Sequence, residues 1–413
     1  MMDCFADIAS LRSEFEILSS RVYGVPLVYF DNAATSQRPR SVVEMERRMM
    51  VEANANIHRA VHRLSAVATD LYEAGREAAR IFIGADSREE VIFTSGTTAG
   101  INLVAAGFAR SFLSKGDKVV VSRVEHHSNI VPWQIACNNT GAELVVAEVD
   151  ECGRLSAETV DASLDENVKL LAVTQVSNVL GVINPIKEIV AKAHAKGIPV
   201  LVDGAQGIVH CATDVKELDA DFYVFSGHKI FAPTGIGILY GKKEWLDRLP
   251  VFMSGGDMVD RVSFEKTTFA PLPLRFEAGT QNFAAAACMV PALEMAAAVR
   301  ASAAAMANEK MLMEAMEDCL RKVDGLRMPS LGVPAEERIP VFSFTVEGTH
   351  PSDLAQIMDK MGVALRSGLM CAEPLISQFS DKGMLRASLM PYNTLEEVEI
   401  FAKALDRAVK MLR

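Results

Sequence analysis

The sequence contains few cysteines, and no two of them are spaced as a metal-binding or redox pair. Seven cysteines are spread over 413 residues without a Cys-x-x-Cys motif. An odd number of unpaired cysteines is typical of reduced thiols and argues against both a disulfide framework and a zinc site. We therefore expect a cytoplasmic protein without a metal site.

Basic segments and long apolar runs are also missing. The net charge of −11 repels phosphate backbones and anionic lipids, and no Lys/Arg-rich run offsets it. Residues 1–20 carry acidic side chains, which is not the pattern of a signal peptide. The longest apolar tract, 283–299, is interrupted by Pro291 and Glu294 and is too short to span a bilayer comfortably. Neither nucleic acid nor a membrane is an expected partner.

The sequence does contain a regular alternation of strands and helices. Apolar β-runs separated by helical segments occur at 118–122, 143–149, 169–174, 199–203 and 221–225. This alternation predicts an α/β fold with a mostly parallel sheet covered by helices on both faces. Ligands then bind beyond the carboxyl ends of the strands.

The pattern of predicted helices and strands changes near residue 300, where an α+β pattern begins. We expect a large domain over 26–299 and a smaller α+β domain over 300–413. An N-terminal helical segment, 1–25, is predicted to pack on the small domain.

Lys229 follows an apolar strand that ends at Phe225 and Ser226. An ammonium in such a place is costly to desolvate, so it tends to lose its proton or to bond covalently to a carbonyl. We interpret Lys229 as a Schiff-base lysine. The alternative is a strand-end lysine that reaches solvent.

Other polar residues follow the neighbouring strands. Thr97 and Thr98 begin a helix after Gly96, where free backbone N–H groups hold a phosphate, unless the threonine is an ordinary N-cap. Ser226 and His228 can join Thr98 around that phosphate.

Two further strand-end residues fit a heteroaromatic ring. Asp203 is suited to face a pyridine nitrogen, although it could bond only its own turn. His126 is suited to lie flat on a ring, although it could be a core histidine. With the lysine and the phosphate cradle, these are the groups that a pyridoxal phosphate site requires.

Seven segments carry a resemblance to a known family. They are 97–105 (TTAGINLVA), 125–134 (EHHSNIVPWQ), 177–181 (SNVLG), 202–206 (VDGAQ), 221–229 (DFYVFSGHK), 233–240 (PTGIGILY) and 275–280 (RFEAGT). They closely resemble the SufS-type cysteine desulfurases, which are fold-type I pyridoxal phosphate enzymes of the class V aminotransferase family. The resemblance extends from about Tyr29 to the C-terminus.

The resemblance implies roles for the matching residues. Lys229 would carry the cofactor and Asp203 would face its ring nitrogen, while Gln206 would bond the ring hydroxyl and His126 would stack on the ring. The phosphate would be held by Thr97, Thr98, Ser226 and His228. Thr280 matches a threonine that completes the partner subunit's phosphate site, which implies a homodimer with shared active sites.

On the substrate side, the resemblance implies that Arg386 binds the substrate carboxylate through two parallel hydrogen bonds. Asn178 would contact the same carboxylate or the ring hydroxyl. His58, Arg59 and Arg366 match residues near the substrate, although as charges at helix or strand ends they could equally be solvated.

Cys371, in segment 365–375 (LRSGLMCAEPL), matches the cysteine that takes the sulfur. With Lys229 and His126 it would form the catalytic set. The implied reaction converts L-cysteine to L-alanine and leaves a persulfide that passes to a SufE- or SufU-like acceptor for iron–sulfur cluster assembly. The alternatives are a selenocysteine lyase and a non-catalytic scaffold. The family usually has two histidines directly before this cysteine, whereas this sequence has Leu369 and Met370, which leaves no adjacent imidazole to assist the thiol.

Overall fold

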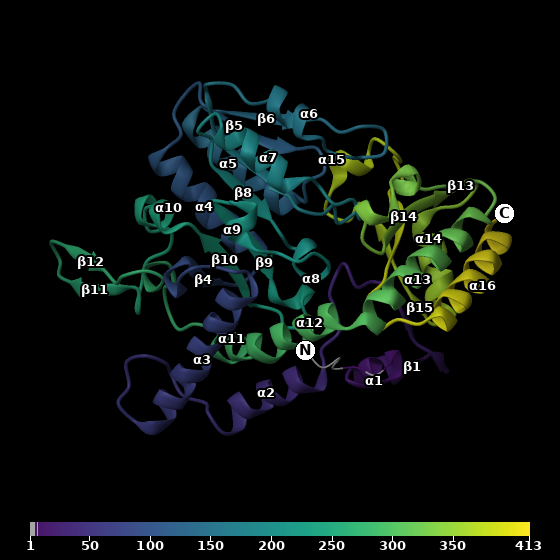
Figure 1. The fold of residues 1–413 in the computed structure, drawn as a ribbon, viewed down its shortest axis with the longest axis horizontal. Coiled ribbons are helices and arrows are strands. Elements are labelled where there is room, and N and C mark those ends of the chain that lie inside the picture. Colours follow the sequence, from purple (N-terminus) through teal and green to yellow (C-terminus); the bar gives the residue numbers. More distant parts are fainter. Residues whose placement is uncertain (1–4, 6) are drawn as a thin grey trace.

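A computed structural model describes residue 5 and residues 7–413, so Asp3 and Cys4 lie outside the described residues. Figure 1 shows a large sheet with flanking helices beside a smaller unit that contains the C-terminus. The α/β prediction with a mostly parallel sheet is confirmed.

The large sheet has seven strands in the order β4-β10-β9-β8-β7-β5-β6. Their bounds are β4 Val91–Thr94, β5 Lys118–Ser122, β6 Glu143–Ala147, β7 Val168–Thr174, β8 Val200–Asp203, β9 Phe222–Ser226 and β10 Gly237–Gly241. Strand β10 runs antiparallel to both of its neighbours, and the other pairings from β6 to β9 are parallel. The carboxyl ends of β5, β7, β8 and β9 therefore meet at one edge of the sheet.

Both faces of this sheet are buried, because alternate residues along each strand point to opposite sides. Val119 and Val121 pack on one side with α4 (Thr97–Ser111), α5 (Val131–Thr140) and α10 (Lys243–Arg248). Val120 packs on the other side. The helices there are α2 (Arg40–Val51), α3 (Arg63–Phe82), α6 (Ala157–Ala162), α7 (Ile186–His194), α11 (Phe283–Ala287) and α12 (Met289–Ala301).

The C-terminal unit is built on a four-stranded antiparallel sheet in the order β13-β14-β17-β16. Its elements are α13 (Ala303–Arg321), β13 (Leu326–Arg327), β14 (Val341–Val346), α14 (Pro351–Lys360), β15 (Val363–Ala364), β16 (Arg366–Gly368), α15 (Glu373–Ile376), β17 (Met384–Ser388) and α16 (Leu395–Leu412). Phe342, Phe344 and Phe401 lie in its core, and so do Val28 and Phe30 from the N-terminal part of the chain. Strand β3 (Val28–Tyr29) pairs in parallel with β15. The domain boundaries at residues 25 and 299 stay a prediction, and Val28 and Phe30 share the core of the C-terminal unit.

The N-terminal segment is less helical than its pattern predicts. It contains the short helix α1 (Ile8–Ser13), a 3-10 turn (Glu16–Ser19) and the small hairpin β1 (Arg21–Val22) and β2 (Val25–Pro26). Phe15 packs in the core of the large sheet, whereas Arg12 forms an ion pair of 2.8 Å with Glu397 of α16. The segment therefore contacts both units.

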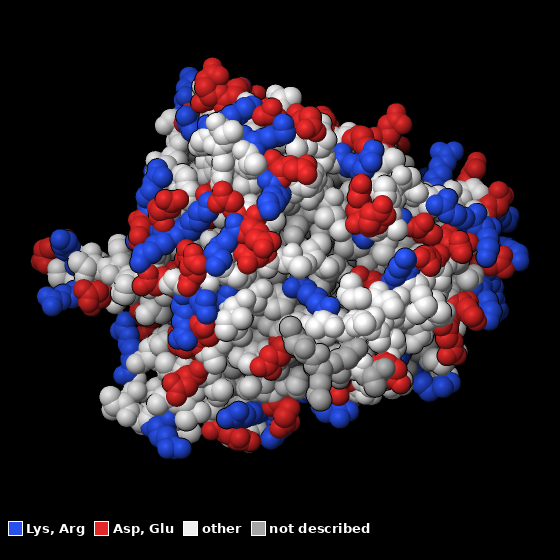
Figure 2. Space-filling view, in the orientation of Figure 1, with Lys and Arg blue, Asp and Glu red and all other residues white. Residues whose placement is uncertain are grey.

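The remaining short elements connect the sheet to its surroundings. They are α8 (Gly207–His210), α9 (Val215–Leu218) and the hairpin β11 (Val259–Val262) and β12 (Thr267–Phe269), which projects from the body in Figure 1. Figure 2 shows acidic and basic side chains interspersed over the face that it draws. By length and composition, one helical stretch of the described chain, Phe283–Ala301, could cross a membrane; half of it is buried, and it packs against α3.

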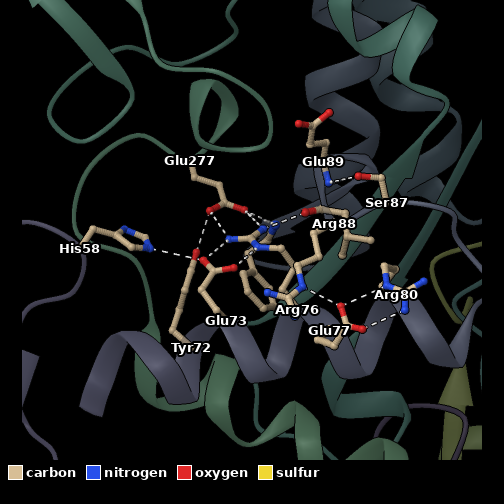
Figure 3. Close-up of polar contacts among 12 residues, drawn as sticks. His58, Tyr72, Glu73, Arg76, Glu77, Arg80, Ser87, Arg88, Glu89 and Glu277 are labelled. Atoms are coloured by element: carbon tan, nitrogen blue, oxygen red, sulfur yellow. Dashed lines mark hydrogen bonds and ion pairs between the residues drawn. The ribbon is translucent and has the colours of Figure 1, made fainter. Parts of the chain in front are cut away.

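A buried ion pair joins α3 to the segment that leads to Thr280 (Figure 3). The guanidinium of Arg76 donates to Glu277 Oε1 at 2.6 Å and to Glu277 Oε2 at 2.9 Å, and both side chains are 1% exposed. Tyr72 Oη and the backbone N–H of Phe93 also donate to this carboxylate, each at 2.7 Å. The pair ties α3, β4 and the 275–280 segment together.

Glu277→Gln is expected to lower the free energy of unfolding by about 3 kcal/mol, because the buried Arg76 charge then keeps only the partly exposed Glu73, at 3.0 Å, as its counter-ion. Denaturant unfolding monitored by circular dichroism measures this loss. Glu399→Gln is the control, since it breaks only an exposed pair with Lys403 and should cost less than about 1 kcal/mol. Equal losses in the two variants would contradict the structural role of the Arg76–Glu277 pair.

Candidate active site

A cavity of about 460 Å³ lies at the edge where the parallel strands end. The predicted site residues that line it are Thr97, Thr98, His126, Asn178, Asp203, Gln206, Ser226, His228, Lys229, Arg366, Cys371 and Arg386. The first nine come from the unit built on the large sheet, and the last three come from the C-terminal unit. A larger groove of about 900 Å³ between α13 and α16 is lined by other residues of the described chain, among them Cys319 and Val398.

Lys229 ends a 3-10 turn directly after β9 and borders the cavity. Its side chain keeps some surface toward the cavity but is otherwise enclosed by protein. Burial lowers its pKa from the usual 10.5 to about 8, although the charge of Asp203 acts in the opposite direction. About a tenth of the amine is therefore neutral at pH 7, far more than for an ordinary lysine, and the neutral form is the one that attacks a carbonyl.

Asp203 is the last residue of β8 and is 3% exposed. Its Oδ1 accepts the backbone N–H of Ala205 at 2.9 Å. Burial raises the pKa of this carboxyl, while the Ala205 N–H and the Lys229 charge lower it. The turn bond that the sequence allowed as an alternative is thus present, and the carboxyl also lines the cavity.

The start of α4 has the features of an anion cradle. Its N-cap residue is Gly96, and no side chain caps the helix, so the ordinary threonine N-cap is not what the structure contains. Ser226 Oγ accepts the Thr97 N–H at 2.8 Å and lies 2.8 Å from Thr97 Oγ1. Beyond that bond, the first turn presents N–H groups and hydroxyls toward the cavity, a combination that holds a phosphate.

The two cavity histidines are neutral at physiological pH. Burial, with the nearby Lys229 charge, lowers the pKa of His126 to about 3 and that of His228 to about 4. The backbone N–H of Ser128 donates to His126 Nδ1 at 3.1 Å. Because that nitrogen is an acceptor, the proton of the neutral ring lies on Nε2.

Arg386, on β17, is 3% exposed and is held on two sides. Its Nη1 donates to the Asn178 carbonyl at 2.8 Å, and its Nη2 donates to Asp31 Oδ1 at 3.2 Å. Its Nε is buried without a hydrogen-bond partner. The guanidinium also borders the cavity, so it is suited to bind an incoming carboxylate.

Gln206 and Asn178 use part of their bonding capacity within the protein. Gln206 Nε2 donates to the Ala33 carbonyl at 2.8 Å, and Asn178 Nδ2 donates to the Met370 carbonyl at 2.8 Å. Both side chains still line the cavity. The predicted contacts of Gln206 with a ring hydroxyl and of Asn178 with a ligand stay predictions.

Cys371 lies in the loop between β16 and α15, and its side chain is exposed where it borders the cavity. Met370 and Cys371 both have positive φ, +44° and +54°. The thiol thus faces the same cavity as the Lys229 amine and the Arg386 guanidinium, and a second protein can reach it.

Three predicted residues do not line this cavity. His58 contacts Glu73 at 3.3 Å in the cluster of Figure 3, and Arg59 pairs with Asp257 at 2.9 Å. Thr280 is exposed at the surface. Within this chain these three residues therefore do not join the cavity residues.

Asp31, in the cavity, and Glu125, buried beside it, are not among the predicted site residues. Asp31 lines the cavity, and the available signal was the turn-rich 31–35 segment after a short strand. Glu125 is fully buried beside His126 and accepts hydrogen bonds from Ser122, from Asn129 at 2.7 Å and from Thr174 N at 2.8 Å. Burial raises its pKa to about 8. Its carboxyl ties the ends of β5 and β7 together.

Comparison with known proteins places this geometry in context. The family model described as aminotransferase class-V matches residues 28–401. A cysteine desulfurase of Synechococcus elongatus is 45% identical over 97% of the chain, which spans 63% of that protein's length. A probable cysteine desulfurase of Vibrio cholerae is 41% identical over 98% of the chain and 99% of its own length.

Solved structures agree with these sequence relatives. The cysteine desulfurase CsdA of Escherichia coli superposes with a TM-score of 0.90 at 36% identity, covering 99% of this chain and 100% of that one. An apo cysteine desulfurase of Thermococcus onnurineus gives a TM-score of 0.93 at 35% identity, with 100% of both chains covered.

Reductive methylation of Lys229 in cofactor-free protein is expected to show a pH midpoint near 8, since only the neutral amine reacts and burial lowers its pKa to about 8. Mass spectrometry of the Lys229 peptide across a pH series measures the midpoint. Asp203→Asn should move the midpoint to lower pH, because the carboxylate charge holds the proton on the amine. The exposed Lys403 is the internal control. A Lys229 midpoint equal to that of Lys403 would contradict the proposed desolvation.

Proposed function

The chain belongs to the aminotransferase class-V family, and its full-length relatives are cysteine desulfurases; from this premise we propose that it removes the sulfur of L-cysteine and releases L-alanine. The observation that carries the proposal is the meeting of Lys229, Arg386 and Cys371 in one cavity. An amine, a carboxylate-binding group and a thiol are what the reaction requires.

Pyridoxal phosphate fits the cavity as the cofactor. The fit rests on a buried carboxyl, a lysine with lowered pKa and a helix start without a side-chain cap, all at one strand edge. Asp203, Gln206, His126 and Lys229 would hold the ring, and the phosphate would lie with Thr97, Thr98, Ser226 and His228. When bound, this group supplies an electron sink for the substrate α-carbon.

Lys229 and Arg386 orient and activate the substrate. Arg386 borders the cavity and would bind the substrate carboxylate there, and Asn178 and Asp31 fix the guanidinium in place. Because burial lowers the pKa of the Lys229 amine to about 8, its neutral form is accessible near neutral pH, and its Nζ can take the proton from the substrate α-carbon and return a proton to the product. The neutral His126 ring is suited to stack in the same space.

Cys371 performs the sulfur transfer. Its thiolate attacks the substrate sulfur, so that an S–S bond forms while the C–S bond breaks. The electron pair of the C–S bond stays with the carbon fragment, which is protonated and leaves as alanine. The sum is cysteine plus the Cys371 thiol giving alanine plus a Cys371 persulfide, and it needs no external oxidant or reductant.

The partners belong to the same proposal. We infer a homodimer in which Thr280 completes the partner subunit's phosphate site, in agreement with its exposed position outside this chain's own cavity. The exposure of Cys371 suits transfer of the sulfur to a SufE- or SufU-like acceptor protein for iron–sulfur cluster assembly.

Cys371→Ser is expected to lower alanine formation from cysteine on the order of 100-fold or more, because a hydroxyl is a far weaker nucleophile than a thiolate toward sulfur. Quantifying alanine by chromatography measures this loss, and the yellow colour of the bound cofactor should persist. Cys152→Ser, a change outside the cavity, should keep the wild-type rate. Full alanine formation by the Cys371→Ser variant would refute the nucleophile role.

Arg386→Lys is expected to lower kcat/KM for cysteine by about 10- to 100-fold, since an ammonium cannot reproduce the planar contacts to Asn178, Asp31 and a carboxylate. Steady-state kinetics measure the change. Arg154→Lys, which alters exposed ion pairs with Asp150 and Glu337 outside the cavity, is the matched control. An unchanged kcat/KM for Arg386→Lys would mean that another group binds the carboxylate.

A further inference from the structure

The loop that carries Cys371 is held by residues from the large sheet. The backbone N–H of His127 donates to the Cys371 carbonyl at 2.7 Å. The backbone N–H of Glu373 donates to His127 Nε2 at 3.1 Å. His127 therefore contacts the loop at two points, the carbonyl of Cys371 and the N–H of Glu373.

This loop needs such support because its backbone is unfavourable for L-residues. Met370 and Cys371 are consecutive and both have positive φ, a region that side chains with a Cβ rarely adopt. Asn178 Nδ2 holds the Met370 carbonyl at 2.8 Å, and the Met370 side chain is 7% exposed in an apolar cluster with Val124 and Val179. External contacts thus maintain the conformation that presents the thiol.

The side chains before the cysteine contribute no imidazole. At the two positions where the family resemblance leads one to expect histidines, Met370 is buried in the apolar cluster and Leu369 is 38% exposed. The histidine that does contact the loop comes from the turn His127–Asn129 after β5, next to the predicted ring-stacking residue His126.

We propose that His127 is the positioning residue of Cys371, and that its main-chain N–H and its Nε2 together set the thiol at the mouth of the cavity. The Glu373 N–H is only a donor, so Nε2 must accept, and the ring proton lies on Nδ1. This inference rests on the proposed function, since it assigns His127 a role only if Cys371 is the nucleophile.

The required acceptor distinguishes three substitutions at His127. Glutamine places its Oε1 near the position of Nε2 and can accept the Glu373 N–H, whereas asparagine is too short and alanine has no acceptor. All three keep the backbone donor to Cys371. Alanine formation in the first turnover should fall about fivefold to tenfold in His127→Ala and His127→Asn, the loss of one charge-neutral hydrogen bond, and should stay within about twofold of wild type in His127→Gln.

Two further readouts separate positioning from general damage. Hydrogen exchange of the peptide that contains Glu373 should be faster in His127→Ala and His127→Asn than in wild type and His127→Gln. KM for cysteine and the visible absorbance of the bound cofactor should be unchanged in all three variants, because the ring and the carboxylate contacts are intact.

The results of these experiments distinguish a failure of the positioning role from a failure of the desulfurase proposal. If Cys371→Ser abolishes alanine formation but His127→Ala keeps the wild-type first-turnover rate, the positioning role is wrong and the desulfurase proposal stands. If His127→Gln loses as much as His127→Ala, the Nε2 acceptor is not the cause, and the inference is overturned. If Cys371→Ser itself keeps the full rate, the proposed function has failed first.

Discussion

The desolvation of one ammonium group at the edge of the sheet is the constraint on which the active site depends. Lys229 sits where β9 ends, with a pKa lowered by burial to about 8 and with Asp203 as the nearby counter-charge. This is possible because both faces of the sheet are covered, so the strand ends open into a cavity and not into bulk water. A buried amine that is partly neutral at physiological pH is already prepared for carbonyl chemistry.

The C-terminal unit supplies the cavity's arginines and its cysteine. Arg366, Cys371 and Arg386 approach the cavity from the antiparallel C-terminal sheet. The contacts of Arg386 with Asp31 and with the Asn178 carbonyl connect that sheet to the first third of the chain and to the end of β7. The cavity therefore lies between two separately built layers, and each of them fixes groups on the other.

Sequence reasoning located most of the cavity because its residues follow strands. Asp203, Ser226 and Lys229 directly end or follow β8 and β9, and parallel strands bring their carboxyl ends to one edge. His58, Arg59 and Thr280 were identified only by resemblance, and none of them lines this chain's cavity. Their matching motifs do not show whether these side chains reach this chain's cavity, because a motif records local chemistry and not the direction in which its segment points.

Periodicity and strand-end chemistry in the sequence by themselves determined the α/β class and the lysine with its acid. Both depend on residues close together in the chain or on the general geometry of parallel sheets. Only the tertiary structure decided that His127 binds the cysteine loop at Glu373, 246 residues away. It also decided that Asp31 accepts a hydrogen bond from Arg386 and that Val28 packs in the C-terminal core. The physical reason is that such contacts depend on how the two sheets pack and on which hydrogen-bond donors and acceptors that packing brings together. Spacing along the chain constrains neither.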